Sequence, residues 1–292
     1  MNIKHLFFLC IILLLGGCKT EEKSYTGKNY IEFSTLNHTF GVLNNEEWFE
    51  IPIVASYPVD SKLNIGVEVI ATESSAIEGL HFELESHTVA INADKKNAAI
   101  RIKGLAENLA INNTYEIVLS LILNEENSIS GKSPRTKVTL QRCYPFDINN
   151  FAGYAVLTST WSMQYMNTNS TLVRTHIDEN SDNTVVIEDM FYEGYDIRVQ
   201  LDSTNRLEPL ATLCGAQVLG STGEAFGTIY GNGKLMIGYA PEGYISYYST
   251  YENFLLLYSE IYVEEVGTVG YFGHILEWIS DDEAERIMRE GF

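Results

Sequence analysis

Hydrophobic and polar residues alternate along most of this chain, which is the pattern of β-strands with one buried face. In the first half, such stretches recur with turn residues between them, at 51–54, 63–69, 88–91, 99–103, 116–123 and 137–140. About seven short strands over roughly 110 residues are typical of a β-sandwich. The pattern therefore predicts a sandwich domain over residues 27–142.

Three short stretches of this region, 76–82, 88–91 and 98–102, resemble the Calx-beta-like domains of Bacteroidota surface lipoproteins. The resemblance implies an immunoglobulin-like sandwich of two sheets. In calcium-binding members, acidic residues cluster at one end of the sandwich. His81 stands where that family usually has an aspartate, and 105–108 lacks its consecutive aspartates. We therefore expect a structural or spacing role for this domain, without the family's calcium site.

The second half, residues 146–292, is also rich in alternating stretches, at 154–158, 172–177, 184–187, 195–201, 234–239, 254–263 and 271–279. Asn232-Gly233 predicts a tight hairpin turn, because this pair accepts positive φ angles. Ser280 followed by Glu283 is typical of a capping box at the start of a short C-terminal helix. The sequence thus predicts an all-β chain, in which the sandwich is followed by an antiparallel barrel or a second sandwich and a short helix.

The start of the chain has the features of an export signal. Lys4 precedes an apolar run over 6–15, and Leu15-Gly16-Gly17-Cys18 follows. The apolar run is shorter than the ~20 residues that span a bilayer. The segment resembles a bacterial lipobox, which implies removal of residues 1–17, a lipid on Cys18 and a linker over 18–26. The short charged stretch after Cys18 resembles that of Bacteroidota lipoproteins, which implies a surface-exposed location on the outer membrane.

Charge and cysteine content narrow the function further. The chain has 39 Asp and Glu against 19 Lys and Arg, a formal net charge of −20. Such a chain repels phosphate backbones, so nucleic acid is not an expected partner. Besides Cys10 and Cys18, only Cys143 and Cys214 are present. They form a disulfide or remain free thiols, and no Cys-x-x-Cys or Cys/His cluster indicates zinc.

The sequence contains no recognised catalytic motif and no histidine spacing typical of a metal site. We therefore expect no enzymatic activity and no cofactor. One loop places oxygen-bearing side chains at alternate positions, as calcium loops do, and the calcium candidates are Asp178, Asn180, Asp182 and Asp189. Strand-like flanks and the abundance of Asn and Asp in hairpin loops favour a plain turn.

Aromatic residues are concentrated in the second half. Sugar rings stack their apolar faces on aromatic planes, and the candidate ligand-binding residues are Trp161, Tyr165, Tyr244, Tyr247, Tyr248 and Tyr251. Tyrosine is also favoured within strands, so packing is the competing explanation.

The functional hypothesis is a lipid-anchored, non-catalytic envelope protein that binds glycan through its second domain and is associated with nutrient uptake. The alternative is a structural or adhesive lipoprotein that contacts envelope proteins and binds no small ligand.

Overall fold

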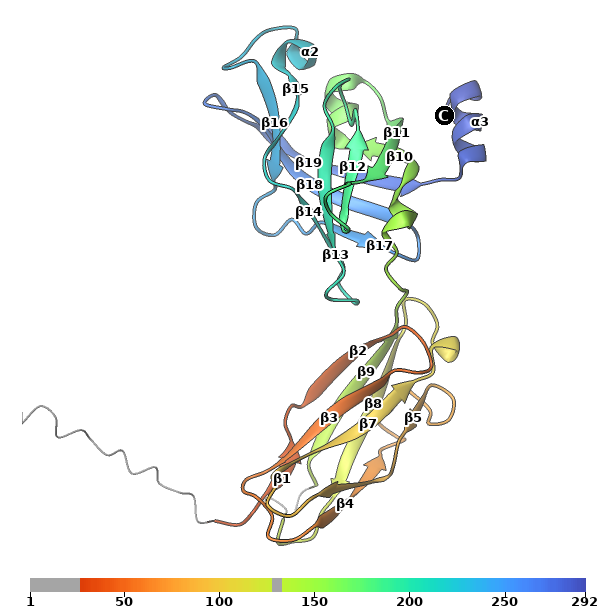
Figure 1. The fold of residues 1–292 in the computed structure, drawn as a ribbon, viewed down its shortest axis with the longest axis vertical. Helices are drawn as coiled ribbons and strands as arrows, with labels where there is room; N and C mark the ends of the chain where they lie inside the picture. Colours follow the sequence, from red (N-terminus) through yellow and green to blue (C-terminus); the bar gives the residue numbers. More distant parts are fainter. Residues whose placement is uncertain (1–26, 128–132) are drawn as a thin grey trace, which may run out of the picture.

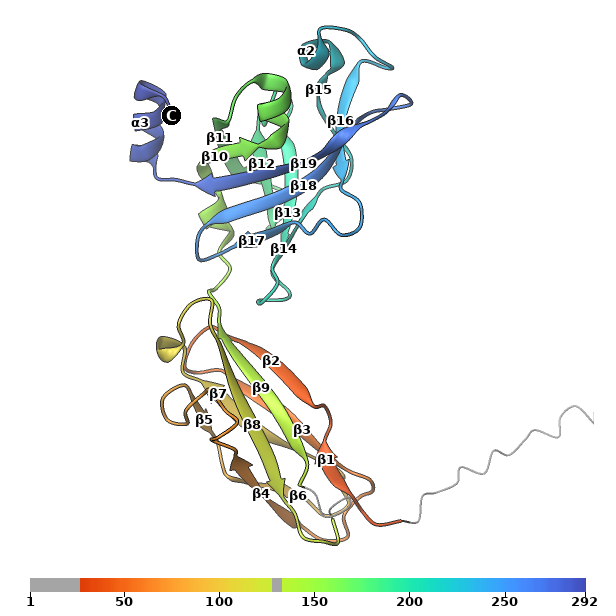
Figure 2. The same ribbon diagram turned by 180° about the vertical axis from the view of Figure 1, so that it is seen from behind.

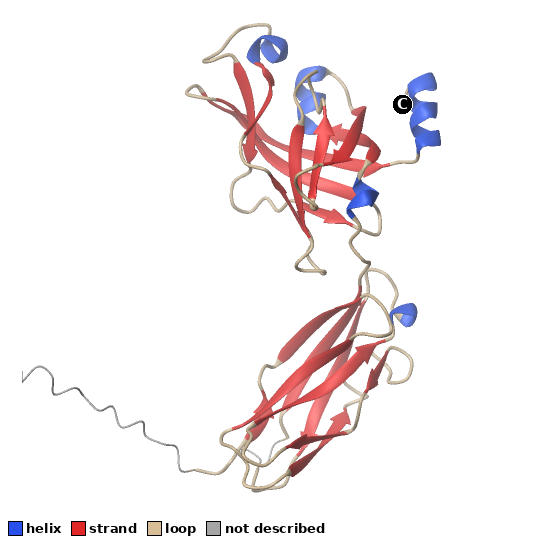
Figure 3. Ribbon diagram, viewed as in Figure 1, coloured by secondary structure: helices blue, strands red, loops and turns tan. Residues whose placement is uncertain are grey.

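The computed structural model describes residues 27–127 and 133–292. The export signal, Cys18 and the linker over 18–26 fall outside the described residues, so their predictions stay predictions. Strands dominate both halves of the chain, and a short helix ends it (Figure 3). The predicted all-β class with a short C-terminal helix is confirmed.

The first unit is a sandwich of two sheets (Figure 1). One sheet has four strands, in the order β1 (Ile31–Phe33), β3 (Trp48–Ala55), β7 (Asn97–Gly104) and β5 (Phe82–Leu84). The other has five, in the order β2 (Asn37–Val42), β9 (Arg135–Arg142), β8 (Thr114–Ile122), β4 (Leu63–Val69) and β6 (Thr88–Ile91). Their inward side chains form one apolar core.

Three strands of the sandwich, β1, β2 and β5, have no counterpart among the predicted stretches. β1 and β5 are only three residues long, too short for alternation to show. β2 pairs in parallel with β9, with His38 opposite Val138, although the chain between them spans most of the sandwich. Long-range pairing of this kind leaves little trace in the local sequence. The 3-10 turn η1 (Ala106–Asn108) lies near the end of this unit that faces the second one.

The second unit is an antiparallel barrel, which decides between the two predicted architectures. It follows the 3-10 turn η2 (Ile148–Phe151). Its eight strands are β10 (Gly153–Ser159), β11 (Ser170–Ile177), β12 (Thr184–Glu188), β13 (Ile197–Asp202), β14 (Leu210–Leu213), β17 (Tyr247–Ser249), β18 (Phe254–Val263) and β19 (Gly267–Trp278). The ring closes because β19 pairs with both β18 and β10, as Figure 2 shows from behind.

The strands β15 (Gln217–Ser221) and β16 (Lys234–Tyr239) extend the sheet beyond the ring, where β16 pairs with the second half of β18. A tight turn forms at 230–233, where Gly231 has a φ of 53°, but it does not join two strands directly as the predicted hairpin turn would. Helix α2 (Thr222–Phe226) and a longer loop join these two strands, and the Gly233 N–H donates to the Tyr230 carbonyl at 2.9 Å. A capping box at Ser221 starts α2, and this local preference competes with a two-residue hairpin.

Helix α3 (Asp281–Glu290) ends the chain and packs against β10 (Figures 1 and 2). The Ser280 hydroxyl caps it by accepting the Glu283 N–H at 3.3 Å. The Glu283 carboxylate pairs with Arg286 instead of returning to the Ser280 backbone, so only half of the predicted capping box is present. Within the described residues, no helix is long and apolar enough to cross a membrane.

Candidate functional site

Four tyrosine side chains gather on the outer face of the barrel, and we call them the tyrosine platform: Tyr239, Tyr244, Tyr258 and Tyr271. The Tyr244 ring lies 5.3 Å from the Tyr258 ring and 6.0 Å from the Tyr271 ring, between centroids. Tyr239, Tyr244 and Tyr271 are each about half exposed, at 57%, 48% and 48%. Strands β16, β18 and β19 and the loop before β17 therefore present aromatic faces to solvent at one place.

Strand periodicity explains why these rings point outward. Along β18, buried and half-buried residues alternate, so that Leu257 faces the core and Tyr258 faces outward. Gly273 is the partner of Tyr258 on β19. A Cβ at Gly273 would lie 3.3 Å from Cε1 of Tyr258, so the glycine lets the ring lie close over β19.

A hollow of about 280 Å³ adjoins the platform and is lined by Tyr239, Tyr244 and Tyr258. It forms because β17 is only three residues long and pairs with β14 through Leu210 alone. Beyond that point the loop 240–246 covers the gap between β14 and β18. The Ser246 carbonyl accepts the Ala211 N–H at 3.0 Å, which holds this loop on the barrel.

Two other predicted tyrosines lie at a second hollow, between the two β units. Tyr247 and Tyr251 are 41% and 50% exposed. The Tyr251 ring lies 4.9 Å from the ring of Tyr144, a residue of the connection between the units. The Tyr247 ring meets Phe254 edge-on at 5.7 Å.

Trp161, Tyr165 and Tyr248 belong to the interior of the barrel. Trp161 is fully buried and stacks on the half-buried Tyr165 at 4.2 Å, and Tyr248 is 1% exposed. Burial, together with the nearby Asp202 carboxylate, raises the pKa of Tyr248 to about 12. The structure gives these three residues a packing role rather than a ligand-facing one, in keeping with the competing explanation from the sequence.

The calcium candidates form parts of two turns instead of one site. The Asp178 carboxylate pairs with Arg198 and accepts the Asn180 N–H at 2.9 Å. The hydrogen bond from the Asn180 N–H, and to a lesser extent the Arg198 guanidinium, lower the pKa of Asp178 from its ordinary value. Asp189 lies in another turn, where it accepts the Gly194 N–H. Among the described residues, no three Asp, Glu, His or Cys side chains are grouped so that they could hold a metal.

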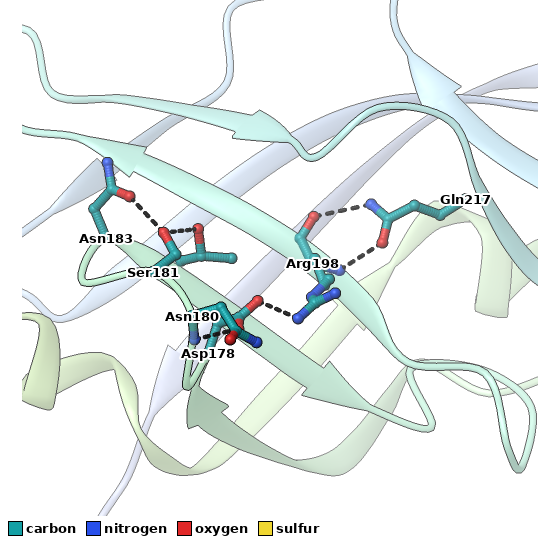
Figure 4. Close-up of polar contacts among 7 residues, drawn as sticks. Asp178, Asn180, Ser181, Asn183, Arg198 and Gln217 are labelled. Carbon is teal, nitrogen blue, oxygen red and sulfur yellow. Dashed lines mark hydrogen bonds and ion pairs between the residues drawn. The ribbon is translucent and has the colours of Figure 1, made fainter.

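The Gln217 side chain holds the backbone of Arg198, the residue that pairs with Asp178 (Figure 4). The Gln217 side chain donates to the Arg198 carbonyl and accepts the Arg198 N–H, both at 2.9 Å. The Asp178 carboxylate is thus paired with a guanidinium and with a backbone N–H of its own turn. Residues 178–183 form the turn between β11 and β12.

Cys143 and Cys214 are both free thiols, and Cys143 is buried whereas Cys214 is exposed. Burial raises the pKa of Cys143, which keeps this thiol protonated. Of the two alternatives from the sequence, the structure shows the free thiols.

One buried histidine of the barrel, His274, joins two serine hydroxyls by hydrogen bonds. The Ser159 hydroxyl lies 2.8 Å from Nδ1 of His274, and the Ser259 hydroxyl lies 2.7 Å from Nε2. His274 is 0% exposed, and burial lowers its pKa to about 3. Both ring nitrogens are thus occupied in a place that solvent does not reach, which describes a structural histidine.

A larger, open hollow of about 690 Å³ lies over the four-stranded sheet of the sandwich. Its lining residues, Glu32, Pro52 and Ala99 among them, include no aromatic ring. The tyrosine platform is therefore the better candidate for a ligand that stacks.

Of the four platform residues, the sequence predicts only Tyr244 as ligand-binding. Tyr239 and Tyr258 lie in the same tyrosine-rich stretch, and their outward positions follow from strand alternation. Tyr271 comes from a different strand, and only the β18–β19 register brings it beside Tyr258.

The fold and the platform define an all-β protein of two units, with an exposed aromatic surface on the barrel. The chain belongs to the family described as "Domain of unknown function (DUF4984)", whose model matches residues 132–290. This match contains the whole barrel. No curated protein matches the chain.

Several solved structures are similar to this chain. The apo form of the Calx CBD1 domain is 14% identical, with a TM-score of 0.33, and the match covers 39% of this chain and 97% of that one. A "putative carbohydrate binding protein" from Bacteroides ovatus is 12% identical, with a TM-score of 0.32 and coverage of 84% and 67%. A protein of unknown function from Bacteroides ovatus is 9% identical, with a TM-score of 0.34 and coverage of 85% and 89%.

Proposed function

We propose that this protein is a non-catalytic glycan-binding protein of the bacterial cell envelope, anchored to the outer membrane by a lipid on Cys18. The barrel carries the binding surface, and the sandwich holds the barrel away from the membrane. The lipobox-like Leu15-Gly16-Gly17-Cys18 supports the anchor.

Glycan binding rests on one observation, the gathering of the platform's tyrosine rings beside a single hollow. The carbon-bound hydrogens of a sugar ring form an apolar face that packs on the electron-rich face of an aromatic ring. Phenolic hydroxyls both donate and accept hydrogen bonds, as sugar hydroxyls do. Tyr244 and Tyr271 offer such faces and remain about half exposed. A neutral sugar is also compatible with the strongly negative chain, because it brings no charge to be repelled.

A glycan array probed with a soluble chain of residues 19–292 tests the proposal. We expect binding to at least one neutral polysaccharide. Titration calorimetry with that polysaccharide should show affinity about ten-fold or more weaker for Tyr244→Ala and for Tyr271→Ala, since central aromatic contacts carry most of the energy of an interface.

Tyr230→Ala is the matched control, because Tyr230 is also 48% exposed but lines neither the platform nor its hollow. Its affinity should equal that of the unmodified chain. The proposal fails if no polysaccharide binds, or if the two platform variants bind as tightly as the control.

A further inference from the structure

The second hollow, between the two β units, has a chemistry of its own. Its volume is about 320 Å³, near the lower end of the roughly 300–1,000 Å³ typical of ligand sites. We call it the junction hollow. Both units and the connection between them contribute to its lining, which includes Asn112, Arg142, Tyr144, Arg206, Tyr251 and Glu252.

Direct contacts between the two units hold the walls of the junction hollow in place. The Arg206 guanidinium of the barrel pairs with Glu47 of the sandwich at 2.6 Å. The Cys143 sulfur lies 3.6 Å from the Arg206 carbonyl oxygen. A Cβ at Gly41 would lie 2.6 Å from that sulfur, so the end of β2 approaches the connection as closely as a glycine allows. These contacts hold the walls of the junction hollow in position without a ligand.

Two aromatic rings form one side of the hollow. The Tyr144 and Tyr251 rings lie 4.9 Å apart and 33° from parallel, and Tyr251 is half exposed. The Arg142 guanidinium lies over the Tyr144 ring, 5.3 Å from its centroid. Such stacking orients the planar guanidinium and leaves its edge free to donate hydrogen bonds.

Arg142 and Arg174 are the two arginines with no acidic partner among the described residues, and of these two only Arg142 lines the junction hollow. Within the described part of the chain, its guanidinium makes one hydrogen bond, a long contact of 3.5 Å to the Leu109 carbonyl. Apart from Arg174, the remaining arginines each contact a carboxylate, namely Arg101, Arg135, Arg198, Arg206, Arg286 and Arg289. In a chain with twice as many acids as bases, a half-buried guanidinium without a carboxylate keeps its donors for another anion.

We propose that the junction hollow binds a sugar ring that carries a carboxylate, as a uronic acid does. The guanidinium of Arg142 holds the carboxylate with two parallel hydrogen bonds. The ring packs on Tyr251 beside Tyr144, and the amide of Asn112 meets its hydroxyls. Glu252 and the negative net charge disfavour densely charged polyanions, which selects a ligand with one charge per ring. This proposal does not rest on the tyrosine platform.

Titration calorimetry of the chain 19–292 with trigalacturonic acid tests the proposal, and the fully methyl-esterified trimer serves as the uncharged probe. We expect the affinity for the acid to be at least about ten-fold higher than the affinity for the ester, because the ester cannot form the charge-assisted pair with Arg142. Arg142→Gln should lose that preference. Arg142→Lys keeps the positive charge but loses the two parallel donors. Its preference for the acid should therefore lie between that of the unmodified chain and that of Arg142→Gln.

Arg174→Gln is the matched control, because Arg174 also lies over a tyrosine, 5.9 Å from the Tyr154 ring, but outside the hollow. It should bind the acid within about two-fold of the unmodified chain, and the unfolding midpoints of all variants verify that they fold. The assignment fails if the acid does not bind, if the ester binds equally well, or if Arg142→Gln matches the control. Tyr244→Ala separates the two sites, because it should weaken a neutral ligand at the platform and leave the acid unaffected.

Discussion

His274 illustrates how burial at a single residue controls a protonation state. Its folded pKa of about 3 lies well below the ordinary value of 6.5, because the ring is completely buried. The neutral ring donates from one nitrogen and accepts at the other, which suits the two serine hydroxyls. A proton added to the ring would force both serines to accept and would place a charge in the core.

The depressed pKa predicts that the barrel loses stability as the pH falls. Below pH 6.5 the unfolded chain binds a proton at this histidine and the folded chain does not, until the pH nears 3. We expect the free energy of unfolding to fall by up to about 1.4 kcal/mol per pH unit from this group alone. Urea unfolding from pH 6.5 to 5, in a Trp48→Phe background, reports on the barrel through Trp161 and Trp278.

His274→Gln should show a shallower pH dependence over this interval, although it is less stable throughout. His38→Gln is the control, because burial also lowers the pKa of His38, which lies in the sandwich. The prediction is contradicted if His274→Gln and the unmodified chain have equal slopes.

At the scale of elements, glycines set how closely strands of opposite sheets approach. Gly104 ends β7 in one sheet of the sandwich, and Val42 ends β2 in the other. A Cβ at Gly104 would lie 2.5 Å from Cγ2 and 2.8 Å from Cγ1 of Val42, which is itself completely buried. The spacing of the two sheets at this end therefore depends on the missing side chain.

Gly104→Ala should destabilise the sandwich by about 1–3 kcal/mol, because one added methyl group overpacks this contact. Gly104→Ala combined with Val42→Ala should cost less than the sum of the two single changes. Urea unfolding, followed by hydrogen exchange of peptides from β7, measures the free energy of unfolding of the single variants and of the double variant.

Gly66→Ala is the control for this pair, since a Cβ there would come no closer than 3.1 Å to any neighbour, the Cβ of the exposed Ile122. It should cost less than Gly104→Ala. If the losses of stability from Gly104→Ala and Val42→Ala add without any difference, the two side-chain positions are not in contact.

At the scale of the whole molecule, the chain has two cores and a strongly negative charge. The sandwich core and the barrel core are separate clusters. A net charge of −20 disfavours direct attraction to anionic lipid headgroups. Attachment to a membrane would therefore depend on the proposed lipid at Cys18, and more than one acyl chain gives stable anchoring.

The anchor predicts that the full chain, expressed in a bacterium that processes lipoproteins, is found in the membrane fraction and incorporates a labelled fatty acid. Cys18→Ala should abolish the labelling and release the protein from the membrane, or leave its signal uncleaved. Cys10→Ala is the control, because it changes a cysteine within the apolar run and preserves Leu15-Gly16-Gly17-Cys18. A cleaved Cys18→Ala protein that stays in the membrane fraction would overturn the anchor.

The sequence by itself determined the all-β class and the long strands, because alternation of apolar and polar residues is a local property. The predicted stretches 234–239 and 254–263 coincide with β16 and β18. It also identified the segment around Tyr244, beside Pro241 and Gly243, as a candidate loop or edge. The sequence did not distinguish a barrel from a sandwich, because closure of the ring depends on the pairing of β19 with both β18 and β10.

Only the tertiary structure decided which aromatic residues face solvent. Tyr247 and Tyr248 are neighbours in the sequence, yet the first is 41% exposed and the second 1%, because successive side chains of a strand point to opposite faces. Tyr271 joins Tyr244 through the pairing of β19 with β18, and Tyr144 meets Tyr251 across the junction of the two units. Residue type follows from the sequence, but the grouping of side chains that makes a binding surface follows from contacts between distant strands.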